Sequence, residues 1–186
     1  MFILFFYLYN IMILPKINSE RYDFIALTNN HLNDVLEIFS NPEVVKFNNY
    51  SLFKNLDDAQ ALIDMYQKRH DDEIGLRWGI KLKNTDKLIG TIGFNTLNIA
   101  EFATIGYDLN FDYWNKGYMT EAIARVVKLG FDEYNLKCIM AEVQIGNIAS
   151  EKVLLKNNFQ FAGSQKIYKI WDNSHYEVNN FVLNKS

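Results

Sequence analysis

Two different spacings of hydrophobic residues divide the chain into predicted strands and helices. Residues 22–27 alternate weakly between polar and apolar, which is typical of a strand. Hydrophobic residues at positions 32, 35, 36 and 39 then follow helical spacing. Asn41-Pro42 is expected to end that helix, because the residue before a proline disfavours the helical backbone. A second helix is predicted over residues 56–70, with acidic residues at its start, where the helix dipole favours them.

Three β-rich runs come next and predict a consecutive antiparallel meander. They cover residues 78–82, 88–95 and 102–109. The polar segment KNTD separates the first two runs and is typical of a hairpin turn.

Beyond the third run the period becomes helical, from Gly117 or Tyr118 to Tyr134. The remaining pattern predicts a strand over residues 138–143 and a short helix over Ile148–Lys156. Residues 159–170 and 176–183 are predicted to form a closing hairpin around the turn WDNS. No repeat and no low-complexity linker interrupts the chain, so no internal domain boundary is expected.

Composition supports one domain. Of the 186 residues, 49% are hydrophobic and 22% are charged, which is enough to bury one core and too little charge for disorder. We expect this domain to occupy residues 12–186. Residues 1–11, MFILFFYLYNI, form an apolar extension. The absence of Lys or Arg before the apolar run argues against a secretory signal, and the run of about 14 residues is shorter than the ~20 that span a bilayer. Because Met12 opens a segment typical of a protein start, we expect the extension to be dispensable. An interfacial anchor is the alternative; membrane association is otherwise not expected.

Charge and cysteine content narrow the classes of partner. The net charge of −3 and the lack of a basic stripe argue against nucleic-acid binding. The one cysteine, Cys138, cannot form an internal disulfide, and we expect a reducing, cytoplasmic location. His31 and His70 fall on predicted helices without metal-ligand spacing, so no metal is expected.

The stretch YWNKGYMTEA, between the third β-run and the long helix, carries candidate chemistry. The first N–H groups of a helix have no partners within it, and together with the dipole they suit a phosphate or diphosphate. Gly117 permits close approach and a positive φ, and Lys116 adds positive charge. An ordinary turn is the alternative from these residues alone. The stretch is neither GxxxxGK[ST] nor GxGxxG.

Four blocks taken together, IGTIGF, ATIGYDL, YWNKGYMTEA and NIASEKVLLKNNF, closely resemble the GNAT superfamily of acyl-CoA-dependent N-acyltransferases. The resemblance covers about residues 14–183 and is closest to the branch that includes ribosomal-protein-alanine N-acetyltransferases. It implies an α+β fold, an α/β three-layer arrangement in which a mixed, mostly antiparallel sheet of six or seven strands splays open in the middle, with about four helices on both faces. It also implies direct transfer of an acetyl group from acetyl-CoA to a primary amine in a ternary complex, by a monomer or homodimer.

The resemblance further implies which residues bind acetyl-CoA. Gly117 takes the glycine position of the family's diphosphate loop, whereas Trp114 and Met119 depart from the usual Gln or Arg and the usual small residue. The strand at 104–109 would offer its backbone to the pantetheine arm. The implied cofactor-binding residues are Tyr107, Asp108, Leu109, Trp114, Asn115, Lys116, Gly117, Tyr118, Met119, Thr120, Asn147 and Ser150.

Aminolysis of a thioester needs a neutral amine, so a base is useful. Thr104 stands where relatives often carry Glu and cannot be that base. We rank Asp108 and Glu142 above Glu101 as candidates, with His175 acting through water as a further one.

Ser150 matches the family's N-x-x-S and is expected to protonate the leaving thiolate; capping of a helix start is its alternative role. The acceptor is left open as a protein N-terminus, such as that of a ribosomal protein, or a small amine. A non-catalytic acyl-CoA-binding or sensing module is the competing hypothesis, favoured by Thr104 and Met119.

Overall fold

The computed structural model describes residues 14–17, 19–48, 50–169 and 174–185. The predicted extension at 1–11 and most of the predicted turn WDNS lie outside these residues. The strands among them are β1 (Tyr22–Ile25), β2 (Leu76–Leu82), β3 (Leu88–Asn98), β4 (Phe102–Leu109), β5 (Cys138–Gln144), β6 (Gln160–Lys169) and β7 (Ser174–Asn184). The helices are η1 (Asn29–His31), α2 (Leu32–Phe39), α3 (Pro42–Val45), α4 (Leu56–Asp71), η2 (Phe111–Tyr113), α5 (Tyr118–Asp132) and α6 (Ile148–Lys156).

The strands form one mixed sheet in the order β1-β2-β3-β4-β5-β7-β6. Neighbouring strands are antiparallel except β4 and β5, which are parallel. The predicted meander of β2, β3 and β4 and the closing hairpin of β6 and β7 are therefore confirmed, as is the mixed, mostly antiparallel α+β fold.

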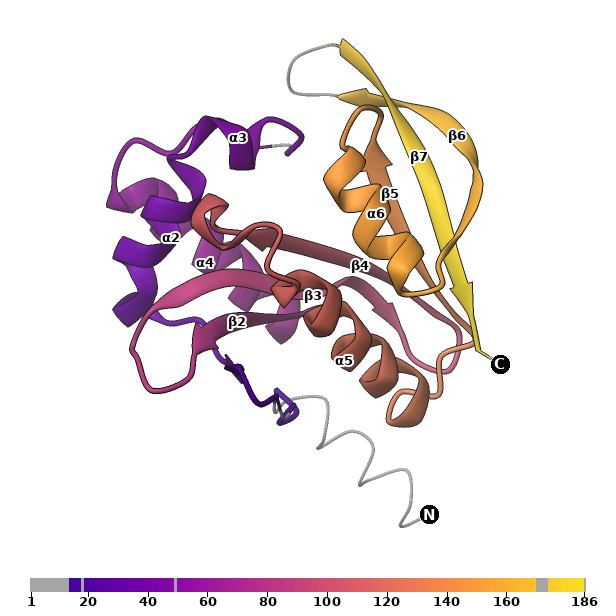
Figure 1. The fold of residues 1–186 in the computed structure, drawn as a ribbon, viewed down its shortest axis with the longest axis horizontal. Helices are drawn as coiled ribbons and strands as arrows, with labels where there is room; N and C mark the ends of the chain where they lie inside the picture. The colour runs from indigo at the N-terminus through magenta and orange to yellow at the C-terminus, as the bar shows by residue number, and fades with distance from the viewer. Residues whose placement is uncertain (1–13, 18, 49, 170–173, 186) are drawn as a thin grey trace.

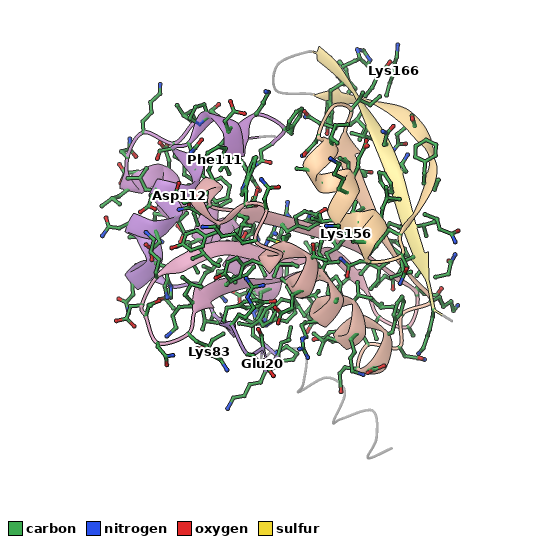
Figure 2. The ribbon with its side chains drawn as sticks, viewed as in Figure 1. Glu20, Lys83, Phe111, Asp112, Lys156 and Lys166 are labelled. Atoms are coloured by element: carbon green, nitrogen blue, oxygen red, sulfur yellow. The ribbon has the colours of Figure 1, made fainter. Side chains whose placement is uncertain are left out.

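Helices cover both faces of the sheet, with α5 and α6 in front of it and α4 behind it in Figure 1. The apolar side of α5 buries Ala122, Ile123 and Val126 in the larger hydrophobic cluster, together with Phe94 and Ile105 from the sheet. A second cluster joins α2 and α4 to β3 through residues that include Phe39, Leu62 and Leu88. In Figure 2, the charged side chains of Glu20, Lys83 and Lys166 lie at the edge of the molecule.

The sheet opens between β4 and β5. These strands pair only through Phe102↔Cys138, Ala103↔Ile139 and Thr104↔Met140. Beyond that point β4 pairs with β3 alone and β5 with β7 alone, and Figure 1 shows the two strands running apart. A β-bulge in β3 at Asn95 lies opposite the place where they part. Because a bulge bends and twists a strand pair, it offers a physical cause for the divergence.

The short helix α3 is an addition to the elements expected from the sequence. Asn41-Pro42 does follow the end of α2, but it also begins a new helix. The Asn41 side chain accepts a hydrogen bond from the Glu43 N–H at 2.9 Å, and Pro42 occupies the first helical position, where its missing N–H costs nothing. No helix among the described residues is long and apolar enough to cross a membrane.

Candidate active site

The loop before α5 leaves the start of that helix open. Gly117 occupies the N-cap position with φ of 78°, and Asn115 also has a positive φ of 58°. Glycine and asparagine are the residues that adopt this backbone most readily. Gly117 has no side chain to cap the helix, so the first N–H groups of α5 are free to bind an anion.

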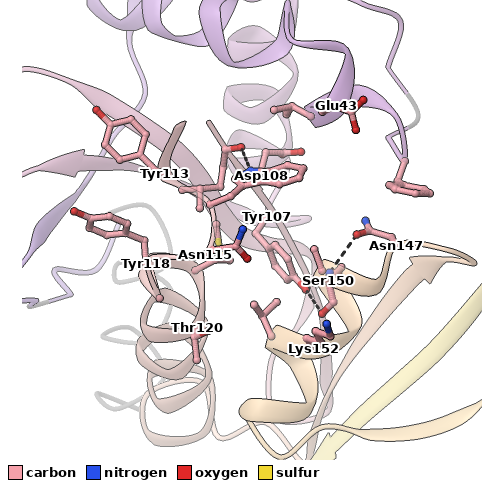
Figure 3. A pocket seen from close by; sticks show the side chains of 18 of the residues that line it. Glu43, Tyr107, Asp108, Tyr113, Asn115, Tyr118, Thr120, Asn147, Ser150 and Lys152 are labelled. Atoms are coloured by element: carbon pink, nitrogen blue, oxygen red, sulfur yellow. Dashed lines mark hydrogen bonds between the residues drawn. The ribbon is translucent and has the colours of Figure 1, made fainter. Parts of the chain in front are cut away.

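A cavity of about 270 Å³ lies against this helix start (Figure 3). It is bounded by the loop, the end of β4, the start of α6, and α3 with the residues that follow it. Eleven of the twelve residues proposed to bind the cofactor line it: Tyr107, Asp108, Leu109, Trp114, Asn115, Gly117, Tyr118, Met119, Thr120, Asn147 and Ser150.

Lys116 is the residue that does not line the cavity. Its ammonium donates to the carbonyl of Asp112 at 2.7 Å and lies 5.5 Å from the centre of the Tyr113 ring. Met119, the departure from the usual small residue, is 6% exposed, and most of its side chain belongs to the core beneath α5. Close approach to the helix start therefore depends mainly on Gly117.

Arg21 also holds this loop, and it was not among the residues expected from the sequence. Its guanidinium donates to the carbonyl of Lys116 at 2.9 Å and stacks over the Tyr118 ring at 3.8 Å. It also lies 3.7 Å from the Glu121 carboxylate. These contacts of Arg21 join residues about a hundred positions apart in the chain, so no local sequence pattern indicates them.

A second cavity, of about 410 Å³, extends between β4, β5 and β7. Its polar lining comes largely from strand side chains, including Arg77, Asn95, Thr104 and Glu142. Five residues line both cavities: Asn48, Tyr107, Asp108, Asn147 and Ser150. The two cavities therefore meet where β4 and β5 part.

Tyr107 and Asp108 are consecutive on β4, so their side chains point to opposite faces of the sheet. Tyr107 points toward Ser150 and Asp108 away from it (Figure 3). The Tyr107 hydroxyl lies 2.8 Å from the Ser150 hydroxyl, and either atom can donate. Burial raises the pKa of Tyr107, which keeps its phenol protonated.

The start of α6 is capped by Asn147, so the capping role considered for Ser150 belongs to its neighbour. The Asn147 side chain accepts a hydrogen bond from the Ser150 N–H at 3.1 Å and caps the helix. The Ser150 hydroxyl is bonded to Tyr107. This arrangement places the serine O–H beside the opening between the strands, where it can exchange a proton.

Asp108 is held by two side chains. The Asn48 amide donates to one carboxylate oxygen at 2.8 Å, and the Thr91 hydroxyl donates to the other at 3.4 Å. Burial raises the pKa of the Asp108 carboxyl above its ordinary value, against the lowering effects of the Arg77 charge and of these two bonds. Among the described residues, it is the carboxylate common to both cavities and lying at their junction.

The other candidate bases lie less centrally. Glu142 is exposed, lines the second cavity and accepts a bond from Gln165 at 3.3 Å. Glu101 pairs with Lys137 at 2.8 Å, and neither Glu101 nor His175 lines either cavity. Within the described part of the chain, no group of three or more His, Cys, Asp or Glu residues is placed to hold a metal.

The residues present fit acetyl-CoA. The free N–H groups at the start of α5 suit a diphosphate, and the edge of β4 that β5 leaves unpaired can bond an arm rich in amides. The junction of the two cavities provides hydroxyl groups on one side and a carboxylate on the other.

The sequence model of the acetyltransferase (GNAT) domain matches residues 21–160. The chain is 31% identical over 172 residues to the uncharacterized N-acetyltransferase YoaA of Bacillus subtilis, covering 92% of this chain and 97% of that protein.

Two solved structures are similar in fold. One is the microcin C7 self-immunity acetyltransferase MccE in complex with acetyl-CoA and AMP, with a TM-score of 0.79, 20% identity, and coverage of 90% of this chain and 94% of that one. The other is RimL, a ribosomal L7/L12 alpha-N-protein acetyltransferase in complex with coenzyme A, with a TM-score of 0.78, 16% identity, and coverage of 91% and 98%.

Proposed function

This chain belongs to the GNAT acetyltransferase family and is an acyltransferase whose co-substrate is acetyl-CoA, and we propose that it transfers the acetyl group directly to a primary amine in a ternary complex. The acceptor is a protein N-terminus, such as that of a ribosomal protein, or a small amine. The single cysteine, Cys138, and this use of acetyl-CoA support a cytoplasmic location.

The observation that carries this proposal is the meeting of two cavities at the gap between β4 and β5. One cavity faces the open start of α5, and the other faces polar strand side chains. Acetyl-CoA in one cavity and an acceptor in the other can therefore reach the junction while both remain bound. Cys138 lines neither cavity, which supports direct transfer over a cysteine-bound acyl group.

We assign each group at the junction a role in moving protons. Acetyl-CoA supplies the acetyl group as a thioester. Asp108 takes a proton from the ammonium of the acceptor, and its raised pKa brings it closer to that of an amine, ~8 to 10. Tyr107 Oη and Ser150 Oγ pass a proton to the departing sulfur, and the helix start near Gly117 binds the diphosphate. Glu142 is proposed to help draw a cationic acceptor into the second cavity.

Release of free thiol from acetyl-CoA tests the proposal, with a panel of peptides, amino acids and small amines as acceptors. Thermal stabilisation by acetyl-CoA in parallel reports binding, since a ligand that binds the folded state raises its stability. We expect both signals. Stabilisation without thiol release for any acceptor would instead support a non-catalytic acyl-CoA-binding module.

Initial-rate kinetics test the direct transfer. Varying both substrates should give intersecting double-reciprocal lines, because both must be bound before reaction. Parallel lines would indicate an acyl-enzyme.

A further inference from the structure

Arg77 on β2 is a buried cation at the wall of the second cavity. It is 9% exposed. Its guanidinium donates to the carbonyl of Gly106 at 2.6 Å and to the side-chain oxygen of Asn95 at 3.0 Å. It also lies over the Tyr66 ring at 4.5 Å. Neutral oxygens and an aromatic face therefore hold the group in place without cancelling its charge.

No carboxylate of the described residues forms a salt bridge with Arg77 within 4.0 Å. Asp108 is near enough to feel its charge, but the oxygens of that carboxylate are bonded by Asn48 and Thr91. A buried charge is costly unless it is paired. The guanidinium is thus ready to bind an anion from the second cavity.

The surrounding backbone keeps the guanidinium in position. Gly106 provides the accepting carbonyl, and a Cβ at this residue would lie 2.5 Å from the Asn95 amide nitrogen. Asn95 is itself the bulged residue of β3, opposite the point where β4 leaves β5. The bulge and the glycine therefore place a fixed arginine beside the opening. A planar guanidinium matches a carboxylate in geometry, often through two parallel bonds.

We propose that the acceptor carries a carboxylate close to its amine and that Arg77 binds this carboxylate. This inference rests on the proposed function, in which the second cavity holds the acceptor. Arg77 and Asp108 line the same cavity, so one can bind the anionic end of the acceptor while the other receives the proton of its ammonium. A free amino acid and a peptide whose first residue is acidic both present this chemistry.

Matched acceptors test the inference. Leucine is compared with leucinamide and with 3-methylbutylamine, and a short peptide amide beginning with aspartate is compared with one beginning with asparagine. In the wild type, we expect kcat/KM for the carboxylate-bearing member of a pair to exceed that of its neutral partner by about 10- to 100-fold, the size of a charged hydrogen bond. Preference within the first set indicates amino acids; preference within the second indicates acidic N-termini.

Two variants should abolish this preference by different routes. Arg77→Gln removes the charge. Asn95→Asp keeps the arginine but gives it a permanent carboxylate partner in place of the amide oxygen now at 3.0 Å, so it remains a test even where Arg77→Gln does not fold. The ratio of the two kcat/KM values should fall toward about 1 in both. Arg125→Gln, which removes a half-exposed arginine on α5, is the matched control and should keep the wild-type ratio.

Two measurements separate this inference from the proposed function: the transfer rates described above, and calorimetric titration of the same acceptors. Transfer with equal rates for charged and neutral acceptors, unchanged by both variants, overturns the role of Arg77 while leaving the acetyltransferase intact. If no acceptor reacts, the affinities measured by calorimetry test the role of Arg77. Affinity that depends on both the acceptor carboxylate and Arg77 supports the inference even then, and absence of such affinity overturns it.

Discussion

We propose that the two sides of the gap between β4 and β5 recognise their ligands by different means. On the side of α5, the groups available to bind a ligand are backbone N–H groups and a strand edge, next to the positive φ of Gly117 and Asn115. On the other side, the binding groups are side chains such as Arg77 and Asp108. Backbone recognition suits a co-substrate shared by a whole family, whereas side-chain recognition allows each member its own acceptor.

The largest expected effect comes from Asp108, at the boundary between the two sides. Asp108→Asn removes the proposed base and should lower kcat by about 10²- to 10⁴-fold. In the wild type, kcat/KM should rise with pH through an apparent pKa above the ordinary ~3.9 of aspartate, and the variant should lose this limb. A wild-type kcat in this variant would show that another group, and not Asp108, is the base.

Stability should change in the opposite direction to activity. The pKa of Asp108 is raised in the folded state, so its stabilising contribution is present below the unfolded pKa and is lost as pH rises through the folded pKa. At neutral pH the ionised carboxylate is therefore a cost, and Asp108→Asn should raise Tm there. The gain should disappear in acid. A lower Tm at neutral pH would contradict this interpretation.

A smaller effect is expected on the side of Ser150. Tyr107→Phe removes one of two hydroxyls that can supply a proton and should lower kcat by about 10-fold, with Ser150 remaining. Tyr134→Phe is the matched control, because its hydroxyl is buried without a hydrogen-bond partner and the residue lines neither cavity. Equal kcat values for the two variants would show that the Tyr107 hydroxyl does not take part in proton transfer.

Gly117→Ala should act on binding. At φ of 78° an alanine is strained by about 1 kcal/mol, and a shift of the loop that relieves the strain should weaken acetyl-CoA binding by about 5-fold. Gly163→Ala, at φ of 107° in β6, also introduces backbone strain, but at a residue that lines neither cavity, and it should lower Tm without changing the affinity. Calorimetry with acetyl-CoA compares the two, and equal affinities would count against the helix start as the diphosphate site.

The smallest effect is expected for Lys116→Ala. Because the ammonium is bonded to the Asp112 carbonyl, the dissociation constant of acetyl-CoA should change by less than about 3-fold. The same titration checks it. A loss of tenfold or more would show that Lys116 turns to the ligand when it binds.

The difference between the two sides also explains what could be predicted from the sequence. The open helix start at Gly117 was predicted because a glycine at a change of period is a local signal. The opening of the sheet between two strands was predicted only from the resemblance to the GNAT superfamily. Arg21, Asn48 and the bulge at Asn95 were missed, because their contacts join distant segments. The short helix α3 was missed because four residues are too few to show a period.

The most direct test of the account is a crystal structure of the protein with coenzyme A. We predict the diphosphate at the N–H groups that begin α5, and the thiol end at the junction of Tyr107, Asp108 and Ser150. Coenzyme A bound elsewhere, or β4 and β5 found paired beyond Thr104 and Met140, would contradict the account.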